Sequence, residues 1–155
     1  MNYHMSRTIY AFCVLFTLSV SSCRKQQPVD LAKSVADADR YYSALSLEKG
    51  RNAAFLAMFD SAGVTLAPHK YPIEGYVAIK KILLSRSDTT YTLTWEPRFA
   101  KVAASGELGY TYGTYKLTSR ATKSLIQEGT YTTIWHKNAQ GEWKALLDTG
   151  NEGLK

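Results

Sequence analysis

Three side chains of the sequence could carry acid–base chemistry, two carboxylates and one imidazole. Asp39 lies in a segment with helical apolar spacing, beside Tyr42, and Asp148 alternates with apolar residues near the end of the chain. His69 lies between two prolines in a predicted loop. A carboxylate or imidazole in an apolar pocket acquires a shifted pKa and can exchange protons with a bound molecule. Asp39, His69 and Asp148 are therefore the candidate catalytic residues.

Each of these candidates also has a purely structural interpretation. Asp39 could lie on the helix surface or pair with Arg40 or a backbone amide. Asp148 could hold the end of its strand through a hydrogen bond, and His69 could be an exposed loop residue. The residue pattern leaves these alternatives open.

Aromatic side chains are the second feature that favours a pocket. The chain contains eleven Tyr and three Trp. A phenol ring offers apolar surface with a hydroxyl at its tip, which suits a small, hydrophobic or partly polar organic ligand. Alternatively, the same rings form a plain core or a dimer interface. The expected ligand-binding residues are Tyr42, Phe55, Phe59, Trp95, Tyr112, Tyr131 and Trp135.

Several other classes of function find no support in the sequence. The histidines and acids do not match a metal-ligand spacing such as His-x-x-x-His, so we predict no metal site and no cofactor. No glycine-rich phosphate loop and no Gly-x-Ser-x-Gly motif occurs. The net charge of +6 is spread along the chain without a basic stripe among aromatics, which argues against nucleic-acid binding.

The N-terminal residues resemble a bacterial lipoprotein signal. An apolar run over 8–20 follows Arg7 and is shorter than the roughly 20 residues of a membrane span. The tetrapeptide Val20-Ser21-Ser22-Cys23 resembles the lipobox, whose Cys receives a diacylglycerol; the alternative is an ordinary secretory signal with an incidental Cys. Lipidation of Cys23 would place the protein in the bacterial cell envelope, on the periplasmic side or at the outer membrane. The expected organisation is a signal peptide over 1–22, a lipid-anchor tether over 23–29, one domain over 30–151 and a tail over 152–155.

Hydrophobic periodicity predicts helices first and strands afterwards. Helical spacing covers 31–49, 51–59 and 76–86, with Gly50 as a stop signal. Alternation predicts strands over 64–67, 89–104, 108–118, 125–137 and 143–148, with a turn at 60–63. This order is typical of an α+β fold in which N-terminal helices pack in the concave face of a curved, mostly antiparallel sheet. Such a sheet, open at one end, leaves a pocket.

The strand phases predict which side chains reach this pocket. We expect Tyr131 and Trp135 on the concave side, together with Tyr112 from the preceding strand. The last three strands also carry apolar residues in the opposite phase, such as Ile126 and Ile134. A sheet that is apolar on both faces must be covered on both or expose a patch. We therefore expect a homodimer.

The sequence resembles the nuclear-transport-factor-2-like superfamily, and within it a lipoprotein branch. This superfamily includes ketosteroid isomerase, scytalone dehydratase and the SnoaL polyketide cyclases. The resemblance implies a cystatin-like cone, with His69 near the mouth of its pocket. It rests on the stretches 39–43, 50–55, 72–75, 95–97, 105–113, 129–131, 141–144 and 148–151.

Two hypotheses of function follow. The first is a lipid-anchored envelope protein with a small-molecule-binding or interaction domain. The second is a cofactor-free isomerase, dehydratase or cyclase that uses an acid, His and Tyr pocket. An enzyme requires a buried acid or His with a shifted pKa at a ligand-sized cavity, whereas a binding protein requires only aromatics and hydroxyls.

Overall fold

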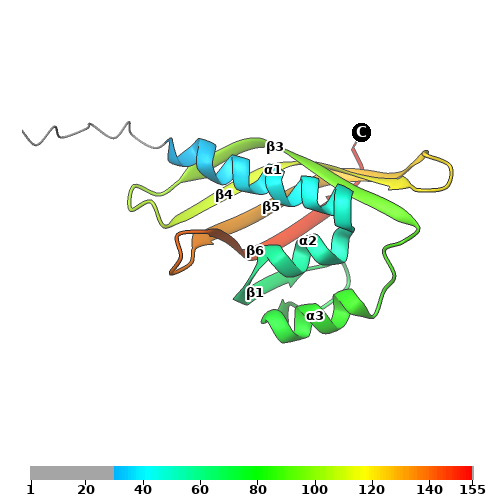
Figure 1. The fold of residues 1–155 in the computed structure, drawn as a ribbon, viewed down its shortest axis with the longest axis horizontal. Helices are drawn as coiled ribbons and strands as arrows, with labels where there is room; N and C mark the ends of the chain where they lie inside the picture. The colour runs from blue at the N-terminus through cyan, green and yellow to red at the C-terminus, as the bar shows by residue number, and fades with distance from the viewer. Residues whose placement is uncertain (1–29, 155) are drawn as a thin grey trace, which may run out of the picture.

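The computed structural model describes residues 30–154, so the predicted signal peptide, Cys23 and the tether lie outside the described part. Three helices and six strands make up the described chain (Figure 1). The helices are α1 (Leu31–Lys49), α2 (Arg51–Met58) and α3 (Tyr76–Leu84). The strands are β1 (Phe59–Leu66), β2 (Ile73–Glu74), β3 (Tyr91–Val102), β4 (Leu108–Ser119), β5 (Leu125–Lys137) and β6 (Trp143–Glu152).

The strands form a single sheet in the order β2-β1-β6-β5-β4-β3. All neighbours are antiparallel except β1 and β6, which run parallel. The α+β prediction is confirmed. The predicted turn at 60–63 is wrong, because β1 begins at Phe59 and passes through these residues with an irregular register against β6.

Helix α1 forms where the sequence signals place it. The carboxylate of Asp30 accepts the backbone N–H of Lys33 at 3.0 Å and caps the first turn. Gly50, with a φ of 92°, ends the helix, and its N–H bonds the carbonyl of Ser46. The buried face of α1 carries hydroxyls as well as apolar groups. Ser43 both donates to the Trp95 carbonyl (2.6 Å) and accepts the Trp95 N–H (2.8 Å), which fixes α1 along β3.

The helices cover the concave face of the sheet (Figure 1), and the hydrophobic core lies between the helices and the sheet. On β5, Tyr131, Thr133 and Trp135 alternate inward and are buried. Thr111 of β4 is paired with Thr133 and is also buried. Trp135 is the largest fully buried side chain and donates its indole N–H to Thr111 at 2.8 Å. The prediction that Tyr131 and Trp135 face the concave side is confirmed.

The convex face carries a group of exposed aromatic side chains. Tyr112 is paired with Thr132, which lies between the inward-facing residues Tyr131 and Thr133 of β5. Tyr112 therefore points to the opposite face and is 47% exposed. Its ring stacks on Phe99 of β3 with centroids 5.3 Å apart, and Tyr110 lies beside Phe99. The prediction that Tyr112 lines the concave side is therefore wrong, because the strand alternates in the opposite phase.

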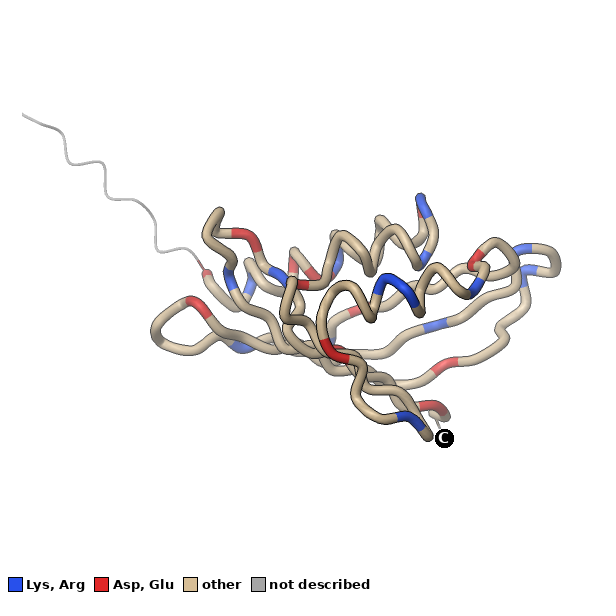
Figure 2. Tube along the Cα trace, turned by 90° about the horizontal axis from the view of Figure 1, so that it is seen from below, with Lys and Arg blue, Asp and Glu red and all other residues tan. Residues whose placement is uncertain are grey.

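Basic and acidic residues are interspersed along the helices and loops rather than gathered in one stripe (Figure 2). None of the helices within residues 30–154 is long and apolar enough to cross a membrane.

Candidate functional site

Two aspartates reach the interior of the cone from opposite sides. Asp39 comes from the middle of α1 and is fully buried. Asp148 comes from β6, where it is paired with Thr133 and therefore faces the concave side. Both residues belong to the predicted catalytic set, and the structure places them in different surroundings.

Asp39 is held by donors on both carboxylate oxygens. The indole N–H of Trp95 donates to Oδ1 at 2.6 Å, and the hydroxyl of Tyr131 donates to Oδ2 at 2.7 Å. Burial raises the pKa of Asp39, while hydrogen bonds from Thr111, Tyr131 and Trp95 act in the opposite direction. Burial beside this carboxyl also raises the pKa of the Tyr131 phenol, which stays protonated and donates. This arrangement joins α1, β3 and β5 at one point.

Asp148 has a sparser set of partners. The hydroxyl of Thr133 donates to Oδ2 at 2.8 Å. Within residues 30–154, Oδ1 accepts no hydrogen bond from a side chain or a backbone amide. Burial raises the pKa of Asp148 to about 7, and the nearby charge of Asp39 acts in the same direction. Near neutral pH this carboxyl therefore exists in both protonation states.

Asp148 lines a cavity of about 160 Å³, here called the inner cavity. Its wall is mostly apolar, and the ionisable side chains in it are Asp148 and the phenols of Tyr115 and Tyr131. The lining residues are Phe55, Met58, Leu93, Trp95, Tyr115, Tyr131, Asp148, Thr149 and Gly150. An engineered cavity of about 150 Å³ with apolar walls binds benzene, so this volume suits one ring.

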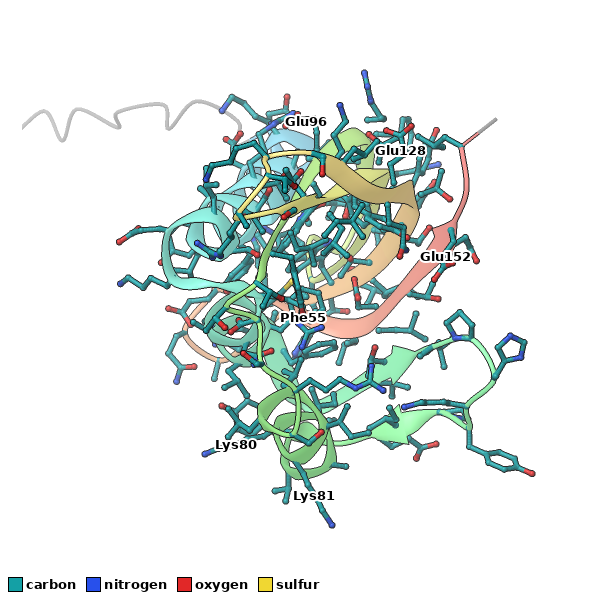
Figure 3. The ribbon with its side chains drawn as sticks, turned by 90° about the vertical axis from the view of Figure 1, so that its right-hand side faces the viewer. Phe55, Lys80, Lys81, Glu96, Glu128 and Glu152 are labelled. Atoms are coloured by element: carbon teal, nitrogen blue, oxygen red, sulfur yellow. The ribbon has the colours of Figure 1, made fainter. Side chains whose placement is uncertain are left out.

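A second cavity of about 450 Å³, here called the outer cavity, lies between α2, α3 and the loop that joins β1 to β2. Phe55 lines both cavities, with its ring 5.8 Å from Trp95 of the inner wall and 5.9 Å from Phe59 of the outer wall. Thr65 of the outer wall is the register partner of Asp148. The two cavities therefore adjoin at Phe55. Figure 3 labels this residue in the fold.

The predicted pocket residues separate into several groups. Phe55, Trp95 and Tyr131 line the inner cavity, whereas Phe59 and His69 line the outer one. Tyr42 and Trp135 do not line the inner cavity but stack on each other in the core, with centroids 5.9 Å apart. Asp39 likewise lies behind the cavity wall.

Tyr115 is the principal pocket residue that the sequence analysis does not identify. It is paired with Gly129 and Trp95, so it faces the concave side in the same phase as Thr111 and Gly113. The inward-facing positions of β4 hold Thr111, Gly113 and Tyr115, whereas Tyr110 and Tyr112 occupy outward-facing positions. Gly129 is the residue related to this placement, because a Cβ there would lie 2.8 Å from Cε1 of the Tyr115 ring.

The remaining candidates for chemistry lie elsewhere. His136 Nε2 lies 2.9 Å from Asp60 Oδ2, and neither residue lines the inner or the outer cavity. In the part of the chain that the structure describes, no group of three His, Cys, Asp or Glu side chains could hold a metal ion.

Comparison with known proteins identifies the fold. No protein-family model matches the sequence, and no curated protein matches it. Solved structures with the same architecture are numerous. A ketosteroid isomerase-like protein from Erwinia carotovora matches with a TM-score of 0.63 and 15% identity, over 82% of this chain and 99% of that one.

Two further structures carry the same fold. A domain of unknown function with a cystatin-like fold from Nostoc punctiforme has a TM-score of 0.67 and 14% identity, over 81% of this chain and 80% of that one. A nuclear-transport-factor-2-like protein from Novosphingobium aromaticivorans has a TM-score of 0.62 and 11% identity, over 76% and 79%. At these identities the likeness concerns the fold alone, and the chain has the cystatin-like cone of nuclear-transport-factor-2-like proteins.

Proposed function

We propose that the cone binds a small organic molecule that contains one ring and a polar group, with the ring in the inner cavity. The carboxyl of Asp148 carries this proposal. It faces a cavity of one-ring size and has one donor among the described residues, so its second oxygen is available to a ligand. The aromatic wall supplies the apolar contact that such a ligand needs.

Native mass spectrometry of the protein purified from its host tests this proposal. We expect a retained small molecule in the wild type. Leu93→Trp fills the inner cavity and should abolish retention, whereas Leu84→Trp, on the exposed end of α3, should retain the same mass. If neither wild type nor Leu84→Trp carries or takes up a ring compound, the proposal is wrong.

A second candidate function is cofactor-free proton transfer, by an isomerase, dehydratase or cyclase. The observation that favours it is the raised pKa of Asp148, about 7, at a position that faces the cavity. A carboxyl with this pKa can accept a proton from a bound substrate and return it at another atom. The ketosteroid isomerase-like neighbour shares the fold that would support this chemistry.

Asp148→Asn distinguishes the two candidate functions. Asn has the same shape but cannot exchange a proton. If the protein only binds, the variant should release the same molecule as the wild type, identified by chromatography and fragmentation. If it is an enzyme, the variant should release the unreacted substrate instead of the wild-type product.

The proposed location is the bacterial cell envelope, with Cys23 as the site of lipidation. The sequence Val20-Ser21-Ser22-Cys23 supports this proposal. Cys23→Ala should abolish incorporation of labelled palmitate in a bacterial host and leave the protein soluble or unprocessed. A wild type that takes up no label would contradict the proposed location.

We also propose that a second copy of the chain covers the convex face. The support is the exposed group formed by Phe99, Tyr110 and Tyr112, a larger patch than isolated surface side chains form. Sedimentation at tens of micromolar should show a dimer that Phe99→Asp dissociates. Tyr71→Asp, which changes an exposed loop aromatic, should leave the dimer intact. A monomeric wild type would contradict this proposal.

A further inference from the structure

The outer cavity combines an apolar floor with a positively charged rim. The floor includes Ile79 and Leu83 of α3, and both residues are buried. Three basic side chains, Arg51, Lys70 and Arg86, contribute to the wall, against the single carboxylate of Glu152. The ionisable lining other than His69 therefore carries an excess of two positive charges.

The positive charges of these three side chains have no acidic partner among residues 30–154. None of the three forms an ion pair there. Arg51 donates through Nε and Nη2 to Asn52 Oδ1, and its guanidinium lies over the ring of Tyr91. Because a guanidinium has five N–H donors, several remain for another acceptor.

The two neighbouring acids, Asp88 and Glu152, offset part of this positive charge but are fewer than its three cations. Asp88 accepts the backbone N–H of Asn52 at 2.7 Å and does not line the cavity. Glu152 lies at the end of β6 (Figure 3), whereas Arg51 begins α2, so the acid and this arginine come from different elements of the outer cavity wall.

The geometry relates this rim to the inner cavity. Arg51 and Phe55 are separated by one turn of α2, a rise of about 6 Å, and so lie on the same face of that helix. Asp148, Gly150 and Glu152 follow one another along the concave face of β6, the first two at the inner cavity and the last at the outer one. One ligand can therefore extend past Phe55 with its two ends in different cavities.

We propose that the ligand is an anionic ring compound, with its ring in the inner cavity and a carboxylate or comparable acid group in the outer cavity against Arg51 and Arg86. An extended linker of four bonds spans about 5 Å, close to this rise of about 6 Å. Arginine is suited to this role because its planar fork binds carboxylates through two parallel hydrogen bonds. This assignment of ligand class rests on the proposed binding function.

Isothermal titration calorimetry of the full chain with 4-phenylbutanoate and its neutral isostere 4-phenylbutanamide tests the assignment. Both probes place the same ring at the same distance from the polar group, and only the charge differs. We expect the acid to bind at least tenfold more tightly than the amide. Arg51→Gln combined with Arg86→Gln should reduce this preference to less than threefold without weakening the amide.

A matched control removes two charges from the same region without touching the cavity. Lys80 and Lys81 lie on the outer side of α3 (Figure 3), and neither lines the outer or the inner cavity. Lys80→Gln combined with Lys81→Gln should leave the preference for the acid unchanged. Equal thermal unfolding midpoints of the variants would show that a loss of the preference reflects binding rather than folding. Arg86→Gln alone, a change at an exposed residue, serves as a further check on folding.

The outcomes separate the ligand class from the binding function. Equal binding of acid and amide, with loss of both in Leu93→Trp, would support the inner cavity as a ligand site and overturn the anionic assignment. Tighter binding of the cationic probe 4-phenylbutylamine than of the acid would overturn it as well. Binding of none of the three probes would count against both proposals.

Discussion

Asp39 and Asp148 are both aspartates that reach the interior of the same cone, yet their surroundings suit them to different roles. The pKa of each carboxyl is raised, and burial is the largest cause in both cases. Asp39 accepts short hydrogen bonds on both oxygens and touches no cavity, whereas Asp148 has one donor and faces the inner cavity. A raised pKa alone therefore does not mark a functional carboxyl. The number of partners that the protein itself supplies distinguishes a structural aspartate from one that is available to a ligand.

Loss of Asp39 should have the largest effect on stability. Asp39→Ala leaves the Trp95 N–H and the Tyr131 hydroxyl without their acceptor, and each unsatisfied buried donor costs about 1–3 kcal/mol. We expect the free energy of unfolding to fall by about 4 kcal/mol in urea titrations. Asp37→Ala, an exposed change two residues earlier on the same helix, should leave the free energy of unfolding nearly unchanged. If Asp39→Ala left the free energy of unfolding nearly unchanged, the structural role given to Asp39 in this comparison would be wrong.

Asp148 should instead make stability depend on pH. Because its pKa in the folded protein, about 7, lies above the ordinary value of 3.8, the folded state binds more protons than the unfolded state between these values. Its contribution is complete below about pH 4 and is lost as the pH rises from there through about 7, a decrease of about 4 kcal/mol.

Asp148→Asn should remove this decrease, since Asn stays neutral at every pH. Urea titrations of wild type and variant across this range measure it. The variant should be the more stable protein at about pH 8, and the two curves should converge towards about pH 4. Asp39 contributes a slope of the same sign to both proteins, so parallel curves would contradict the assignment to Asp148.

The phenol of Tyr131 connects the two regions, because its hydroxyl bonds Asp39 while its ring lines the inner cavity. Hydrogen bonds to charged groups contribute about 1.5–3 kcal/mol, so Tyr131→Phe should lower the free energy of unfolding by about 2 kcal/mol. A double-mutant cycle with Asp39→Asn measures whether this loss passes through the carboxylate. Additive effects would show that the hydroxyl acts independently of Asp39.

The elements of the cone could be predicted because their signals are local. Asp30 and Gly50 delimit α1 by capping chemistry, and Tyr131, Thr133 and Trp135 show a clean alternation on β5. Residues 60–63 combine Asp, Ser and Gly, which favour turns. They nevertheless lie in β1, because Phe59 and Val64 pair with β6 across an irregular register. The competing signal is a pairing between segments that are far apart in the sequence.

The site could be predicted only in part, for the same reason. Asp39 and Asp148 stand out as inward carboxyls, but the partner of Asp39 is 92 positions away, and no pattern near Asp39 indicates it. On β4 the aromatic residues Tyr110 and Tyr112 occupy one phase and Tyr115 the other. Hydrophobicity does not decide between two faces that both carry rings, so only the register identifies Tyr115 as the residue in the cavity.

Tyr112→Phe should have the smallest effect, and it provides the sharpest control for Tyr131→Phe. Register pairs Tyr131 with Gly113, so Tyr112 lies on the adjacent strand one position away and on the opposite face of the sheet. Its ring packs on Phe99 and its side chain is half-exposed, so loss of the hydroxyl should change the free energy of unfolding by less than about 0.5 kcal/mol. Binding of a ring compound in the inner cavity, measured by calorimetry, should stay unchanged. If Tyr112→Phe clearly weakened that binding, a residue on the opposite face of the sheet would take part in it, and the inner cavity would not be the binding site.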